Sequence, residues 1–394
     1  MTPRLTPRAA SAGLVVTMAL AWAGCTGPSS PAAGGGPRSV TVAVEAPLTG
    51  PSAAAGADLV RGVRMAVAQL DAGKGILGHQ VRVVVGDDRG RLAVARRVAA
   101  TLVADRPVAV VGPPDPTLAA VVEPLYRRAG LAVLDVAPGG APRSGVVELQ
   151  GDDEQLAVLD AQEIVSVLHA RTVAVMADPG LPVAAAVPAL QALLVQAGVA
   201  VPLVADLQKP GDVGTALTEL AVMKPDVVVL AVSDAQAGGL AAALVAAGVG
   251  SRRLVVETAP GAAAFAGAAG RAGTDTLVGG LPPLSQMAGG PAYQVAYLRR
   301  YGVDAGPWGA LGADAVTVLS DAARRAGAIT GPAVAEAAMN SASLQGVTGD
   351  LTIDPDSGRR RVPPLAVLDI AKSGVMSIDS AWAAFSGWPP PSGK

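Results

Sequence analysis

Residues 40–88 read VTVAVEAPLTGPSAAAGADLVRGVRMAVAQLDAGKGILGHQVRVVVGDD, and this stretch decides the fold. It opens with VTVAVEA, a short β-branched run typical of a buried strand. Apolar residues then recur at helical spacing over residues 57–71, and VRVVVGDD at 81–88 is a second strand. A strand, a helix and a strand joined by short loops predict parallel strands with right-handed crossovers.

The same alternation continues along most of the chain and restarts after Gly151. Beyond residue 88 we expect helices at 92–104, 117–129, 156–169, 182–197, 213–223, 235–247, 292–301, 310–326 and 332–340. We expect strands at 108–112, 131–137, 172–178, 199–206, 226–232, 252–258 and 274–281, and short strands with hairpin turns over 346–379. The predicted fold class is therefore α/β, with two Rossmann-like lobes whose parallel-rich sheets are joined by a hinge.

Composition restricts the function. A chain of 394 residues can form two or three domains, and its formal net charge of −2 does not favour a nucleic-acid partner. The only cysteine is Cys25, so an internal disulfide framework is excluded. The sequence contains no G-x-S-x-G, Walker A or dinucleotide fingerprint, and its two histidines are far apart. We predict no enzyme activity, no cofactor and no metal.

The amino terminus has the pattern of an export signal. Basic residues at Arg4 and Arg8 precede an apolar segment over 9–22, which is too short to span a bilayer as a helix. The segment ends in Trp22-Ala23-Gly24-Cys25, which resembles the lipobox of bacterial lipoproteins, although Trp22 stands where leucine is usual. We therefore predict a signal peptide over 1–25 and lipidation of Cys25, the alternative being an ordinary signal peptide with a chance cysteine.

The next segment, residues 26–38, reads TGPSSPAAGGGPR and has the composition of a flexible tether. A lipid on Cys25 would hold the folded part at a membrane by burying its acyl chains. The predicted location is thus extracytoplasmic: on the outer face of the cytoplasmic membrane, or in the periplasm, as a lipoprotein.

The segment 40–88 closely resembles the start of the leucine/isoleucine/valine-binding protein family, the type I periplasmic binding proteins of branched-chain amino acid ABC importers. The resemblance rests on the strand followed by PLTGP, on Gly56 and Gly62, on GKGILG and on Asp87-Asp88. VAVVGP at 108–113, LYRRAGLAVL at 125–134 and LQGVTGDLTIDPDSG at 344–358 continue it. The similarity covers nearly all of residues 39–385 and is strongest in the first lobe.

The resemblance implies a domain organisation and partners. The N-terminal lobe would comprise 39–150 and 280–350, the C-terminal lobe 151–279 and 351–385, and the tail 386–394. Three crossover segments would join the lobes. The protein would be a monomer that captures a small-molecule ligand, such as a branched-chain amino acid, an amide or a related solute, and delivers it to ABC permease subunits.

The resemblance also places a ligand cleft, and here the sequence departs from the family. Pro116 stands where a serine is common, glycine replaces a usual threonine near Gly139, and pocket aromatics are missing at Ala55, Pro182 and Ser233-Asp234. The ligand-binding residues that it implies are Asp115, Thr117, Ala137, Gly139, Ser233 and Glu257. Such a cleft predicts a changed, weakened or lost ligand, so a sensory or scaffold lipoprotein with a degenerate cleft is the alternative function.

Other polar motifs have structural interpretations. Asp87-Asp88 follows a strand, 152–154 opens a helix and DPDSG at 354–358 suits a hairpin turn, so we predict caps and turns at all three. Two side chains each have two alternative roles. Asp115 could contact a cationic group or be a solvated loop carboxylate, and Trp308 could stack on a ligand or pack in the core.

Overall fold

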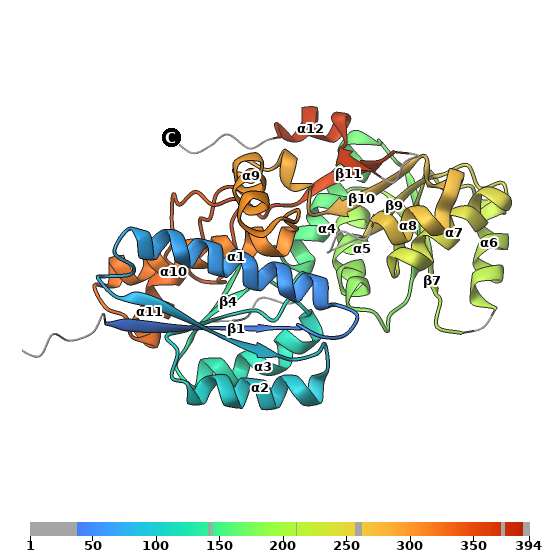
Figure 1. Cartoon of the computed structure of the whole chain (residues 1–394). Coiled ribbons are helices and arrows are strands. Elements are labelled where there is room, and N and C mark those ends of the chain that lie inside the picture. The colour runs from blue at the N-terminus through green and yellow to red at the C-terminus, as the bar shows by residue number, and fades with distance from the viewer. Residues whose placement is uncertain are drawn as a thin grey trace, which may run out of the picture. The chain divides into compact units, whose positions relative to one another are not determined.

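The structure is a computed structural model that describes residues 38–140, 143, 145–209, 211–256, 262–371 and 375–388. Two sheets organise this part of the chain (Figure 1). The first has the strand order β2-β1-β3-β4-β5, with every neighbouring pair parallel. Its strands are β1 (Ser39–Ala46), β2 (Gln80–Asp87), β3 (Ala109–Val111), β4 (Ala132–Asp135) and β5 (Val146–Glu148). Parallel pairing requires crossovers, and helices supply them here.

Helices cover both faces of the first sheet (Figure 1). One face packs on α1 (Ala53–Ala72), α9 (Gly290–Tyr301), α10 (Pro307–Ala326) and α11 (Gly331–Met339). The other packs on α2 (Leu92–Ala104) and α3 (Pro116–Arg128). Alternate residues of β1 explain this division, since Val42 and Val44 join the first core and Ala43 the second.

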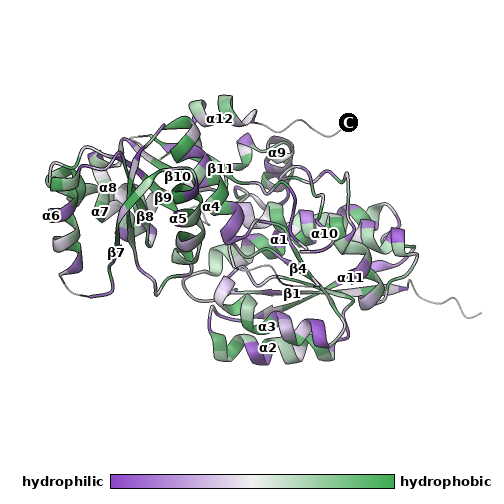
Figure 2. Ribbon diagram, turned by 180° about the vertical axis from the view of Figure 1, so that it is seen from behind, coloured by the Kyte–Doolittle hydropathy of each residue, from purple (hydrophilic) through white to green (hydrophobic). Residues whose placement is uncertain are grey.

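The second sheet has the strand order β12-β11-β10-β9-β8-β6-β7. Its strands are β6 (Thr172–Ala177), β7 (Ala200–Asp206), β8 (Val227–Ala231), β9 (Arg252–Val256), β10 (Thr276–Gly280), β11 (Ala366–Ile370) and β12 (Met376–Ile378). The pairs β10–β11 and β11–β12 are antiparallel, and the others are parallel. Strands β8 and β10 are buried along their whole length, and Figure 2 shows the hydrophobic colour at the centre of this sheet.

Helices with this sheet are α4 (Asp153–Gln162), α5 (Val187–Gln196), α6 (Asp212–Met223), α7 (Asp234–Ala246), α8 (Ala262–Ala269) and α12 (Ser380–Ser386). The chain passes between the two sheets three times: after β5, after β10 and before β11. The predicted α/β fold and its two parallel-rich sheets are therefore confirmed, as are the three crossovers. The exact lobe boundaries stay a prediction.

Several expected elements differ in detail. The helix expected at 156–169 is α4 followed by one π-helical turn, Glu163–Val167, and the helix expected at 182–197 starts as a 3₁₀ turn, Pro182–Ala186. The strands expected between 346 and 361 are only isolated bridges, because each run has too few pairing residues to form a ladder. Strand β5 and helices α8 and α12 were not predicted, since they are short or Ala/Gly-rich.

Candidate functional site

A cavity of about 350 Å³ lies where the carboxyl ends of strands from both sheets meet. It is lined by Pro47, Ser52, Ala55, Gly90, Pro114, Asp115, Pro116, Pro138, Leu181, Pro182, Val183, Val232, Ser233, Asp234, Val256 and Trp308. These residues follow or end β1, β2, β3, β4, β6, β8 and β9, or begin α1 and α10. Ligands of open α/β sheets bind at this edge, so we take this cavity as the candidate site.

The loop after β3 supplies three lining residues in a row, Pro114, Asp115 and Pro116. Asp115 is the N-cap of α3, and its Oδ1 accepts hydrogen bonds from the backbone N–H of Thr117 at 2.8 Å and of Leu118 at 3.1 Å. Pro116 occupies the first helical position, where a missing N–H costs nothing. The amino end of α3 is thus satisfied by a carboxylate of the protein itself.

The second sheet contributes the opposite wall. Ser233 precedes α7, and its backbone N–H and its hydroxyl both donate to Oε1 of Gln236, at 3.2 Å and 2.7 Å. Asp234 is the first residue of α7, and Pro182 opens the 3₁₀ turn before α5. Ala55, Pro182, Ser233 and Asp234 all line the cavity, and these are the positions at which pocket aromatics are expected but missing.

The structure brings together only some of the predicted site residues. Asp115 and Ser233 line the cavity, whereas Thr117 is exposed beside it and is not a lining residue. The N–H of Ala137 donates to Oδ1 of Asp135 at 2.7 Å, and the N–H of Gly139 donates to the carbonyl of Gly151 at 3.0 Å. Those two amides therefore have protein partners.

Two further predicted residues, Glu257 and Cys25, lie outside the described residues. The signal peptide and residues 26–37 of the tether fall in the same undescribed amino-terminal part. A role in ligand binding stays a prediction for all six residues of the implied set.

Trp308 packs in the core, one of the two roles considered for it, and stacking on a ligand stays a prediction. It lies at the start of α10, is half-buried and packs against the core of the first sheet. It also lines the cavity. The indole of Trp308 therefore contributes apolar aromatic surface to the lining.

Acidic residues lie behind this edge of the first sheet. Glu45 of β1 is buried and accepts a hydrogen bond from the hydroxyl of Tyr126, and burial raises the pKa of Glu45 to about 8. Asp88, just after β2, is also buried, and its Oδ1 accepts from the N–H of Gly90 at 2.6 Å. Burial is the main reason why the pKa of Asp88 is raised to about 6, and Asp87 and Asp115 add to it by repulsion.

The predicted structural roles of the other acidic motifs are confirmed. Oδ1 of Asp87 accepts from the N–H groups of Leu48 and Arg89, so Asp87 closes the loop after β1. Asp152 caps α4 and forms a reciprocal pair with Gln155. Asp354 accepts from the N–H of Asp356 and of Ser357, as the predicted turn requires.

A buried charge cluster supports the loop that carries Pro138, and sequence reasoning missed it. Arg143 contacts Glu123 at 2.8 Å, Glu148 at 3.7 Å and Asp135 more closely, and all three carboxyls are buried. Burial raises the pKa of Glu123 to about 9 and of Glu148 to about 8. These groups are up to 25 positions apart in sequence, from Glu123 to Glu148, so no local pattern marks them.

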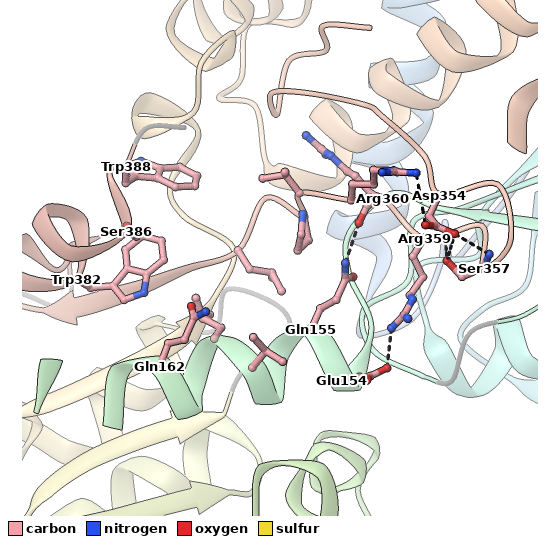
Figure 3. A pocket seen from close by; sticks show the side chains of 16 residues that line it. Glu154, Gln155, Gln162, Asp354, Ser357, Arg359, Arg360, Trp382, Ser386 and Trp388 are labelled. Atoms are coloured by element: carbon pink, nitrogen blue, oxygen red, sulfur yellow. Dashed lines mark hydrogen bonds and ion pairs between the residues drawn. The ribbon is translucent and has the colours of Figure 1, made fainter. Parts of the chain in front are cut away.

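A larger cavity of about 620 Å³ lies between α4, residues 354–365 and α12 (Figure 3). One wall is held by Arg359, which contacts Asp152 and Glu154 at 2.8 Å each. On the other side stand Trp382 and Trp388, whose ring centroids are 5.8 Å apart (Figure 3). This cavity lies at a chain crossing and away from the strand ends of the first sheet, so it is the weaker candidate for the site.

The described residues contain no group of three or more His, Cys, Asp or Glu side chains placed to hold a metal ion. Nor does any helix among them have the length and hydropathy needed to cross a membrane.

Comparison with known proteins identifies the family. A profile of the family described as periplasmic binding protein matches residues 39–374. An amino acid binding protein of Pseudomonas aeruginosa is 33% identical over 147 residues, which are 35% of this chain and 39% of that protein. A Leu/Ile/Val-binding protein of Rhizobium johnstonii is 30% identical over 178 residues, covering 44% of this chain and 48% of that protein. These matches span about half or less of each curated relative.

Solved structures share the fold over a larger part of the chain. A leucine binding protein of Thermotoga maritima superposes with a TM-score of 0.70 at 20% identity, covering 86% of this chain and 98% of that chain. A putative branched-chain amino acid ABC transporter protein of Silicibacter pomeroyi gives a TM-score of 0.75 at 20% identity, covering 87% and 97%. The family profile spans the cavity and every strand of both sheets except β12, and the chain belongs to the periplasmic binding protein family.

Proposed function

We propose that this protein is the extracytoplasmic solute-binding lipoprotein of an ABC importer and captures a small solute in the 350 Å³ cavity. The observation that carries the proposal is the cavity itself: its lining comes from the carboxyl ends of strands in both sheets. A solute there contacts both halves of the fold at once. Those contacts exist only when the halves are together, so the solute favours the closed state.

The relatives support an importer. Those compared above are named as binders of amino acids or as parts of ABC transporters. We infer that the loaded protein hands its solute to permease subunits and that it carries out no catalysis. Anchoring through Cys25 would keep it close to that permease, and a Cys25→Ala variant should then leave the membrane fraction and appear in the soluble one.

The residue types that line the cavity also suit a second function. Five of the lining residues are prolines, namely Pro47, Pro114, Pro116, Pro138 and Pro182. Proline offers neither an N–H nor a hydroxyl, so the cavity has few donors with which to hold a solute. This favours, as the second candidate, a sensory or scaffold lipoprotein whose cleft no longer binds a solute.

A thermal-shift screen distinguishes the importer function from the sensory or scaffold function. Residues 26–394 would be heated with amino acids, amides, urea, short organic acids and amines. A solute at one hundred times its dissociation constant stabilises the native state by about 2.7 kcal/mol, which is a shift of several degrees. A shift with one class supports the importer. A flat response from well-folded protein across all classes would favour the sensory function.

A further inference from the structure

The charged residues that line the cavity have one sign. Among the lining residues that the structure describes, Asp115 and Asp234 are the charged ones, and none is lysine or arginine. Arg89, beside Gly90, is exposed and is not a lining residue. A cavity bordered by low-dielectric walls concentrates the field of its charges, and here that field attracts cations.

Donors for an anionic group are few along the same lining. The five prolines have no N–H, and the N–H groups of Thr117 and Leu118 at the start of α3 already donate to Asp115. The hydroxyl of Ser233 donates to Gln236. Ser52, the N-cap of α1, makes no capping bond, so its hydroxyl and the amino end of α1 remain as donors on this lining. An amino acid carboxylate placed elsewhere along the lining would lose its water and gain little in return.

The groups that suit a cation are present. Both capping bonds of Asp115 end on Oδ1, which leaves Oδ2 for a solute. Trp308, on the same lining, offers an aromatic face, and cations bind over such faces. Apolar proline and valine side chains fill much of the remaining wall and suit an alkyl body.

We propose that the cavity takes a small organic cation, an amine or a quaternary ammonium compound with an apolar body, and that Asp115 pairs with its charge while Trp308 covers it. The proposal rests on the proposed function, in which this cavity is the solute site. Under this proposal the solute differs from that of relatives named for leucine, because it carries no carboxylate.

Carboxyls behind the lining contribute to the same field. Repulsion from Asp115 is one cause of the raised pKa of Asp88, so the two carboxyls interact electrostatically. The pKa of Asp88 is about 6, hence Asp88 is ionised at neutral pH. A cation in the cavity would thus relieve a repulsion that the empty site carries.

The test uses solutes that share one apolar body and differ in charge. Leucine is the zwitterion, 3-methylbutylamine lacks the carboxylate, 4-methylpentanoate lacks the ammonium group and 3-methylbutanol is neutral. Choline and its neutral isostere 3,3-dimethylbutanol make a second matched pair for quaternary ammonium. Each is titrated into residues 26–394 by calorimetry at pH 7.5. We expect one of the two cations to bind about tenfold or more tightly than its uncharged isostere and than leucine.

Variants locate the interaction. Asp115→Asn keeps an oxygen to cap α3 but removes the charge, and it should weaken cation binding about tenfold. Trp308→Leu should weaken it by a smaller factor. The matched control is Asp379→Asn, which alters the N-cap aspartate of α12 outside the cavity and should leave the affinity unchanged.

Each result has a distinct meaning. Tighter binding of leucine than of both cations overturns the cation proposal and keeps the solute-binding function. Cation binding that Asp115→Asn does not alter also overturns it, because the pairing carboxylate would be elsewhere. If no solute of any charge binds, the proposal and the solute-binding function fall together.

Discussion

Replacing Gly62 by alanine tests the packing that holds the site in place. Gly62 lies on α1 where that helix crosses α10, and an added Cβ would lie 1.9 Å from the carbonyl oxygen of Gly309. That neighbour is backbone, so no side-chain rotation can relieve the contact. The two helices must move apart, and α10 carries Trp308 into the cavity.

The expected magnitude combines two opposing effects. Alanine in a helix interior is favoured over glycine by about 1 kcal/mol. Overpacking of a close contact costs about 1–3 kcal/mol and more when backbone has to shift. We therefore expect Gly62→Ala to lower the free energy of unfolding by about 2 kcal/mol and to weaken solute binding through the displaced Trp308.

Gly239→Ala is the matched control. It lies inside α7, and nothing stands within 4 Å of the Cβ that alanine would add. The same exchange should raise stability there by about 1 kcal/mol. Urea unfolding followed by circular dichroism measures both variants. If Gly62→Ala is as stable as Gly239→Ala, the close crossing of α1 and α10 is refuted.

Three other substitutions test the buried ionisable groups and their ion pairs. Burial raises the pKa of Glu163 from an ordinary 4.5 to about 7, so the folded state favours the protonated carboxyl. Ionisation of this buried carboxyl therefore lowers the free energy of unfolding as the pH rises from 4.5 to 7. Glu163→Gln should gain up to about 3 kcal/mol over wild type between pH 4 and pH 9 in urea unfolding; a gain independent of pH would contradict the cause. Arg143→Met removes the cation from three buried carboxyls and should cost up to about 3–5 kcal/mol, whereas exposed Arg96→Met should cost little, as melting curves would show. Arg359→Met leaves buried Asp152 without its cation and should lower the melting temperature more than exposed Arg96→Met does.

The sequence predicts the fold well because its signal is periodic. Buried strands such as β8 are continuous apolar runs, and helices such as α10 repeat apolar residues every three or four positions. The π-helical turn at Glu163–Val167 has no such signal. The buried Asp160, just before this turn, lies close to Gly279 of β10, and no local pattern predicts that contact.

Only part of the candidate site can be predicted from the sequence, because the sequence marks strand ends and does not mark contacts between distant residues. Strand ends can be located from the sequence, so Asp115 and Ser233 are found on the cavity as the resemblance implies. Whether a group still has a free hydrogen-bonding atom depends on its neighbours in space. The amide of Ala137 is engaged by Asp135, and the cluster around Arg143 joins residues that no local spacing connects.

If a solute binds between the strand ends of the two sheets, blocking that cavity must abolish binding. Val183→Trp would place an indole on the lining at a position where no family aromatic is expected, whereas Ala100→Trp places one on the exposed surface of α2. Calorimetry would use the solute with the largest thermal shift in the screen. We expect loss of binding in Val183→Trp and unchanged binding in Ala100→Trp, with both variants folded. Undiminished binding by folded Val183→Trp would refute a solute site in this cavity and direct attention to the larger cavity beside α4.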